Sequence, residues 1–139
     1  MKEELDIKLF KSFPNLYRGV NKPITENLMS LGFECSDGWF KLIWDLSEKL
    51  EKIILELPEK DRERFCAVQV KTKFAGLRFY MDAQTEEMSK LIDEAENLSY
   101  EICEYCGEKG KLYDDGWMTT LCEKCQKEVE DEKEKRKND

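Results

Sequence analysis

The chain has 139 residues, a formal net charge of −8, 40% hydrophobic residues and 39% charged residues. This composition predicts a folded protein with solvated helix faces, and the negative charge argues against nucleic acid as a partner unless a local basic patch overcomes it. No histidine occurs, which removes Ser-His and Cys-His nucleophiles and the usual general base at neutral pH. We therefore expect a protein that is not an enzyme.

The N-terminal segment MKEELDIKLF carries acidic residues where a signal peptide would be basic, and no later stretch is apolar for long enough to span a bilayer. We expect a cytoplasmic protein with no membrane partner. Apolar residues at helical spacing predict a short amphipathic helix over 2–13, stopped by Pro14. The same spacing predicts a second short helix that begins near Pro23 and ends at Gly32.

Two longer helices are predicted because apolar residues recur every three or four positions over 38–57 and again over 85–102. Ser36 or Asp37 is the expected N-cap of the first helix, and Thr85 is the expected N-cap of the second. The second helix leads directly into the cysteine-rich C-terminal segment.

Between these helices the hydrophobic period changes to two, which predicts a β-hairpin over about 66–81. Polar residues alternate with apolar ones in the first strand, and a turn at Ala75-Gly76 joins it to the second strand. Lys71, Lys73 and Arg78 are expected on the face opposite the apolar side chains.

Four cysteines form a CxxC…CxxC pattern, which is the strongest chemical signal in the sequence: Cys103, Cys106, Cys122 and Cys125. Two such pairs supply the four thiolates of a tetrahedral Zn²⁺ site, so we expect a structural zinc ion with no open position for a catalytic water. A small hairpin between the pairs and a helix that begins at the second pair resemble the order of a treble-clef zinc finger. Cys35 and Cys66 are expected to be buried as small hydrophobic residues.

The predicted fold class is α+β, with helices packed on a small antiparallel hairpin or sheet and a C-terminal, treble-clef-like zinc finger with four cysteine ligands. We expect an α+β domain over 1–102, the zinc finger over 103–128 and a charged tail over 129–139. The tail holds one apolar residue, Val129, so its helix is expected to fray into solvent.

A cationic and aromatic cluster on the hairpin is a candidate ligand site. Lys71, Lys73, Arg78 and Tyr80 share one strand face, and Trp39 precedes the long helix in the segment GFECSDGWF. Arginine and lysine can bind phosphate while an aromatic ring stacks on a base. The alternative is that these charges are ordinary surface residues paired with nearby acids, and that Trp39 belongs to the core.

Three segments carry a resemblance to a known family: ITENLMSLGFECSDGWF, VQVKTKFAGLRFY and ICEYCGEKGKL…GWMTTLCEKC. Over most of residues 14–126 the chain resembles a family of small uncharacterised proteins encoded by bacteriophages and prophages, whose motifs are GFEC-x-DGWF, VKxKF-x-GLRFY and a zinc finger with four cysteines. The resemblance implies a phage context, a bacterial host cytoplasm and cysteine-bound zinc, but no particular activity. Ala75 stands where the family's turn usually reads Gly-Gly, which should alter the hairpin turn.

The leading hypothesis is a phage accessory protein that binds and sequesters a ligand, in its sharpest form a nucleotide-type immune signal. The alternative is an adaptor or inhibitor that docks on a host protein through Trp117, Trp39 and neighbouring apolar surface. A nucleic-acid-binding finger is a weaker alternative, since acids are interleaved with its lysines. A homodimer also remains open.

Overall fold

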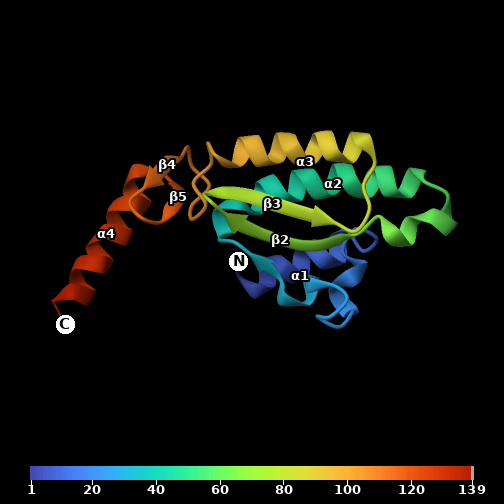
Figure 1. Cartoon of the computed structure of the whole chain (residues 1–139), viewed down its shortest axis with the longest axis horizontal. Helices are drawn as coiled ribbons and strands as arrows, with labels where there is room; N and C mark the ends of the chain where they lie inside the picture. Colours follow the sequence, from blue (N-terminus) through green and yellow to red (C-terminus); the bar gives the residue numbers. More distant parts are fainter. Residues whose placement is uncertain (139) are drawn as a thin grey trace.

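A computed structural model, which describes residues 1–138, shows an α+β protein with a body of helices and sheet and a finger at one end (Figure 1). The helices are α1 (Glu3–Ser12), α2 (Phe40–Glu56), α3 (Glu86–Ser99) and α4 (Glu123–Lys137), and short 3-10 turns are η1 (Arg18–Asn21), η2 (Leu28–Leu31), η3 (Asp37–Trp39) and η4 (Glu59–Arg64). The strands are β1 (Phe33–Glu34), β2 (Ala67–Lys73), β3 (Gly76–Met81), β4 (Lys111–Asp114) and β5 (Met118–Leu121). No helix within residues 1–138 is long and apolar enough to cross a membrane.

The sheet of the body contains the predicted hairpin and one strand that the sequence did not indicate. β2 and β3 pair antiparallel, with Val70 opposite Phe79 and Lys71 opposite Arg78. β1 adds to the other side of β2 in parallel, giving the order β1-β2-β3. A two-residue strand is too short to produce an alternating pattern, so only the tertiary fold reveals it.

The turn of the β2–β3 hairpin consists of Phe74 and Ala75, and both residues have positive φ, at 50° and 70°. A two-residue hairpin loop of type I′ requires positive φ at both central positions, and glycine or asparagine normally meets that requirement. Phe74 and Ala75 carry Cβ atoms, so this turn holds local strain.

The two long helices are confirmed, with shorter bounds than the sequence predicts. Thr85 caps α3 as expected, since its hydroxyl accepts from the N–H of Met88 at 3.2 Å. α3 stops at Ser99, whose Oγ accepts from the N–H of Leu77 on β3 at 2.9 Å. This bond ties the end of the helix to the edge of the sheet.

The N-terminal helix is confirmed as α1, but the short helix predicted from Pro23 to Gly32 is wrong except for the 3-10 turn η2. The side chain of Asn27 prevents a regular helix, because it accepts from the N–H of Met29 at 2.8 Å and donates to the carbonyl of Ala67 at 3.1 Å. These two bonds fix an irregular backbone beside β2.

The body has one hydrophobic core, to which the sheet, α1, α2 and α3 contribute. α2 and α3 run side by side along the sheet, and α1 lies on the other side of α2 (Figure 1). Val70 and Phe79 face the core from neighbouring strands, while Lys71 and Arg78 occupy the opposite face of the sheet.

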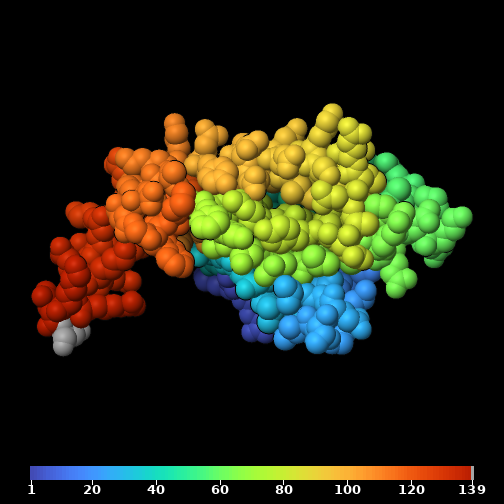
Figure 2. Space-filling model, viewed as in Figure 1, coloured from blue at the N-terminus to red at the C-terminus, as the bar shows by residue number. Residues whose placement is uncertain are grey.

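The C-terminal helix projects away from the rest of the molecule (Figures 1 and 2). The predicted frayed tail is wrong up to Lys137, because α4 continues from Glu123 to that residue. Its first turn contains Glu123 and its last turn contains three basic residues, so the side-chain charges complement the helix dipole. The residues beyond Gln126 are nevertheless solvated, as their composition indicates.

Candidate functional site

The four predicted cysteines converge on one point at the end of the body. Cys103 and Cys106 lie on the turn that follows α3, and Cys122 and Cys125 lie at the start of α4. All four Sγ atoms lie within 4.8 Å of one another, and those of Cys106 and Cys122 are 3.6 Å apart. A tetrahedron with metal–sulfur bonds of about 2.3 Å has sulfur–sulfur edges of about 3.8 Å. The cluster can therefore hold a tetrahedral metal ion.

Backbone N–H groups favour thiolates in this cluster. Burial opposes the ionisation of Cys103, but N–H groups of Cys106, Cys122 and Tyr105 outweigh it and lower the pKa of Cys103 to about 7. Burial and the neighbouring sulfur atoms raise the pKa of Cys125. A bound cation would be needed to keep all four groups ionised together.

The order of elements in the finger (residues 103–128) is the predicted one. A turn that contains Gly107, at φ 84°, is followed by the antiparallel strands β4 and β5 and then by α4. Cys122 is the N-cap of α4, and its Sγ accepts from the N–H of Cys125 at 3.4 Å. The helix N-terminus therefore faces the sulfur cluster, which favours negative charge there.

The finger has almost no hydrophobic core of its own. Its buried hydrophobic cluster consists of Cys103, Leu121 and Cys125, with Tyr113 and Val129 packed at the margin. Two of these three buried residues are metal-ligand candidates. Such a small core cannot offset the entropy of ordering the finger, so its fold depends on the metal.

The segment GFECSDGWF forms a cradle for the first cysteine turn. The N–H of Gly38 donates to the carbonyl of Glu104 at 2.8 Å, and the indole N–H of Trp39 donates to the carbonyl of Ile102 at 2.9 Å. A Cβ atom at position 38 would overlap the carbonyl oxygens of Cys103 and Glu104. Glycine is required there because two backbones pass at close range.

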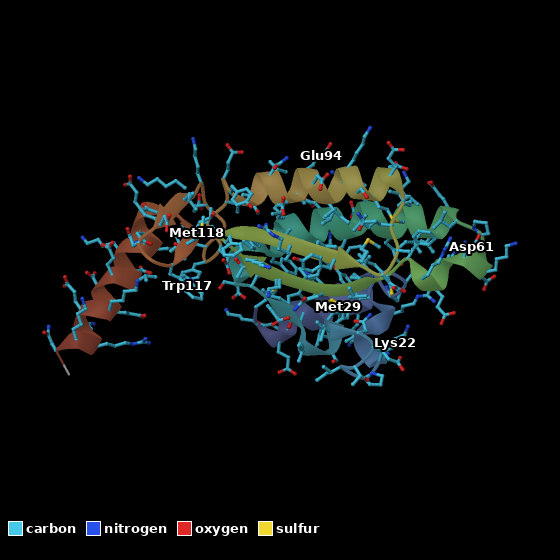
Figure 3. The ribbon with its side chains drawn as sticks, in the orientation of Figure 1. Lys22, Met29, Asp61, Glu94, Trp117 and Met118 are labelled. Carbon is cyan, nitrogen blue, oxygen red and sulfur yellow. The ribbon has the colours of Figure 1, made fainter. Side chains whose placement is uncertain are left out.

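A cleft of about 630 Å³ lies where the turn of the β2–β3 hairpin meets the finger. We call it the finger cleft, and the lining residues used below are Thr72, Lys73, Phe74, Glu104, Tyr105 and Trp117. Figure 2 shows the finger in orange against the light green end of the hairpin, and Figure 3 labels Trp117 at this junction. The indole of Trp117 is 77% exposed, so it is available for contact.

Glu104 is the buried polar residue of the finger cleft, with only 7% of its surface exposed. Its Oε2 accepts from the N–H of Ser36 at 3.1 Å. Burial raises the pKa of Glu104, and hydrogen bonding to Thr72 and Ser36 opposes that shift. A carboxylate at this depth can recognise hydrogen-bond donors on a ligand.

The residues predicted to bind a ligand do not all meet at one cavity. Lys73 lines the finger cleft, whereas Lys71, Arg78 and Tyr80 lie on the outer face of the sheet. Arg78 is engaged by α3, since its Nη1 lies 2.8 Å from a carboxylate oxygen of Glu96. It also donates to the Tyr100 hydroxyl at 3.2 Å.

Trp39 is a correction to the predicted ligand site and to the predicted docking surface. Its side chain is fully buried, and its indole N–H is bonded to a backbone carbonyl of the cradle. It therefore offers no ring face to a ligand or to a partner protein. Cys35 and Cys66 are buried, as expected, and burial raises the pKa of Cys35 to about 12.

The sequence-based reasoning missed Glu104, Tyr105, Phe74 and Thr72 as parts of a site. One signal was available, because a large aromatic residue at a turn position that favours glycine is unusual. Glu104 and Tyr105 lie between two cysteines, where the metal pattern draws attention away from the intervening side chains.

Comparisons with known proteins give no match: no family model fits the chain, and neither the curated proteins nor the solved structures include a significant relative.

Proposed function

We propose that the protein is a zinc-stabilised binding protein that captures a small ligand in the finger cleft and does not transform it. The observation that carries this proposal is the cleft itself. Its volume of about 630 Å³ falls within the range of about 300–1,000 Å³ that small-molecule sites occupy. Exposed aromatic rings on its walls and a buried carboxylate inside it supply the combination of apolar contact and directed polar groups that such sites use.

Zinc is the proposed metal because the donor set consists of four cysteine sulfur atoms, which suits tetrahedral Zn²⁺. Four protein ligands leave no position for a reactive water, so the ion would hold the finger in place. Elemental analysis of protein purified without chelator should give one zinc ion per chain, and the Cys106→Ser variant should retain less.

The proposed ligand is nucleotide-like, and its capture would sequester a signal. Trp117, Tyr105 and Phe74 can stack on a planar base, and Lys73 can contact a phosphate. In the phage context that the sequence resemblance implies, removal of a nucleotide-type immune signal would favour the phage.

Native mass spectrometry of the purified chain tests the proposal, because it reports the metal and any retained small molecule together. Titration calorimetry with a panel of nucleotides should then give binding that Trp117→Ala weakens at least about 10-fold. Tyr80→Ala is the matched control, since Tyr80 is an exposed aromatic residue on the outer sheet face and does not line the cleft. A recovered ligand should be chemically unchanged, and the appearance of degradation products would contradict a role in binding alone.

A second candidate is a protein-interaction module, which the exposure of the aromatic residues around the cleft favours. Trp117 and Phe74 are 77% and 64% exposed, and Leu112 on β4 is also exposed. Exposed apolar residues that gather in one region are typical of protein interfaces. Recovery of one stoichiometric host protein on the tagged chain, lost in Trp117→Ala and kept in Tyr80→Ala, would support this function.

A further inference from the structure

We infer that the finger cleft selects a guanine base, through two adjacent N–H donors that face the carboxylate of Glu104. The inference rests on the proposed function and names the ligand class of the same cleft. Three features carry it: the remaining acceptor capacity of Glu104, the aromatic walls, and the distribution of charge around the opening.

Glu104 has room for two more hydrogen bonds. An ionised carboxylate offers about four lone-pair positions. Oε2 accepts from the N–H of Ser36, and hydrogen bonding to Thr72 uses a further position. The other positions suit a planar group with two neighbouring N–H donors, because such a group can bond both oxygen atoms at once.

Among the common bases, guanine carries that pair of donors, in its N1–H and its exocyclic N2 amino group. Adenine and cytosine place a ring acceptor next to their amino group, so a carboxylate would face a lone pair. Uracil has one ring N–H between two carbonyl oxygens. A site built around a hydrogen-bonding group rejects analogues that leave the group unpaired, so Glu104 discriminates in favour of guanine.

The aromatic walls supply the stacking that a base requires. Tyr105 is 46% exposed, and together with the exposed rings of Trp117 and Phe74 it lines the cleft. Stacking on aromatic rings tolerates every base, since each base has a π-face. The walls therefore supply affinity for bases in general, while Glu104 supplies the choice of base.

Charge around the opening limits the number of phosphates. The ammonium of Lys73 lies 5.5 Å from the centroid of the Phe74 ring, and within residues 1–138 Lys73 forms no ion pair. Asp114 lines the same cleft, and the chain carries a net charge of −8. One free cation against these negative charges favours a monophosphate or a cyclic phosphodiester over a triphosphate.

Titration calorimetry of the zinc-loaded full chain with four nucleotides tests the inference. Guanosine monophosphate should bind about 10- to 100-fold more tightly than adenosine monophosphate, as expected for a bidentate contact to a base edge. Inosine monophosphate lacks the exocyclic amino group and should bind about 10-fold more weakly than guanosine monophosphate, with no change in the protein. Guanosine triphosphate should bind more weakly than the monophosphate.

Two variants separate the choice of base from general affinity. Glu104→Gln keeps an oxygen for the Ser36 N–H but replaces one acceptor with an N–H₂ donor, so the ratio between guanine and adenine nucleotides should fall to near one. Trp117→Ala should weaken both nucleotides by a similar factor and leave the ratio unchanged. Zinc content and circular dichroism of each variant verify that the finger is folded, and the inosine comparison stands on the wild-type protein alone.

The outcomes distinguish this inference from the proposed function. Equal affinity for guanosine and adenosine monophosphates in the wild-type chain would overturn the guanine inference and leave ligand capture standing. The same holds if no nucleotide binds but native mass spectrometry finds another retained small molecule that Trp117→Ala loses. If the chain retains no small molecule and binds none of the panel, both the inference and the proposed function are wrong.

Discussion

Thr120 on β5 donates its hydroxyl to the backbone carbonyl of Ala75 at 2.7 Å, which bonds the finger directly to the strained turn of the β2–β3 hairpin. Both residues are buried, so water cannot replace this bond. The finger cleft opens beside this contact, because the same turn and the same strand contribute to its wall.

Loss of this hydroxyl should destabilise the protein. Thr120→Val keeps the shape of the side chain but leaves the Ala75 carbonyl without its donor, at a cost of about 1–3 kcal/mol in the free energy of unfolding. Thr119→Val, on the opposite face of β5, should change it by less than about 0.5 kcal/mol. Urea denaturation measures both variants, and equal effects would contradict a specific role for the bond.

Gly38→Ala should displace the first cysteine turn from its cradle. The new methyl group would overlap two backbone carbonyl oxygens, which cannot move aside as a flexible side chain can. We expect a loss of about 3 kcal/mol or more and a lower affinity for the metal. Gly116→Ala is the control: its φ of 89° adds strain, but nothing lies within 4 Å of the added atom. The control should cost only about 1 kcal/mol and keep the metal.

Phe74→Asn should raise stability and lower ligand affinity. Asparagine tolerates positive φ better than phenylalanine, and the Phe74 ring is largely exposed, so little packing is lost. We expect a gain of about 0.5–1 kcal/mol in thermal or urea denaturation, together with weaker binding in the cleft. Tyr80→Asn lies in the regular strand β3 and should lower stability. A drop in stability for Phe74→Asn would show that the turn is not strained.

Removal of the metal should unfold the finger and leave the body folded. The finger has three buried hydrophobic residues, whereas the body has a core of its own. A strong chelator should therefore abolish ligand binding while most of the helical circular dichroism from α1, α2 and α3 remains. Cys106→Ser should behave like chelated protein, and Cys66→Ala should retain the metal. Full unfolding on chelation would mean that the body also requires the ion.

Asp6 on α1 should make the protein less stable as the pH rises. Burial raises the pKa of Asp6, and its Oδ1 is buried without a hydrogen-bond partner. The unfolded chain releases this proton at a lower pH than the folded chain, so stability is lost as the pH rises from about 4 through the raised pKa. Asp6→Asn should increase the unfolding midpoint at pH 7 and have a smaller effect at pH 3. An unchanged or lower midpoint at pH 7 would contradict this account.

The sequence predicts the parts of this protein that depend on local pattern. Apolar residues at a spacing of three and four locate α2 and α3, alternation locates β2 and β3, and the cysteine spacing identifies the metal ligands. The Thr85 cap follows from one residue type at one position. Each of these features is determined within about 20 residues of chain.

The parts that could not be predicted depend on contacts between distant segments. Ser36 meets Glu104 across 68 positions, and Ala75 meets Thr120 across 45. The aromatic segment around Trp39 has the composition of a ligand site, but it packs beneath the first cysteine turn. Composition alone does not separate these two uses, because both place aromatic residues beside glycine.

The reliance of the finger on its ion gives the metal a second consequence. Glu104, Tyr105 and Trp117 belong to the finger, so the wall that they form exists only while the ion is bound. Thermodynamic linkage then requires the converse, namely that a ligand seated against this wall slows or opposes the release of the ion. The apparent affinity of the chain for its ligand will therefore follow the supply of free zinc, which makes metal availability in the cell a control on capture.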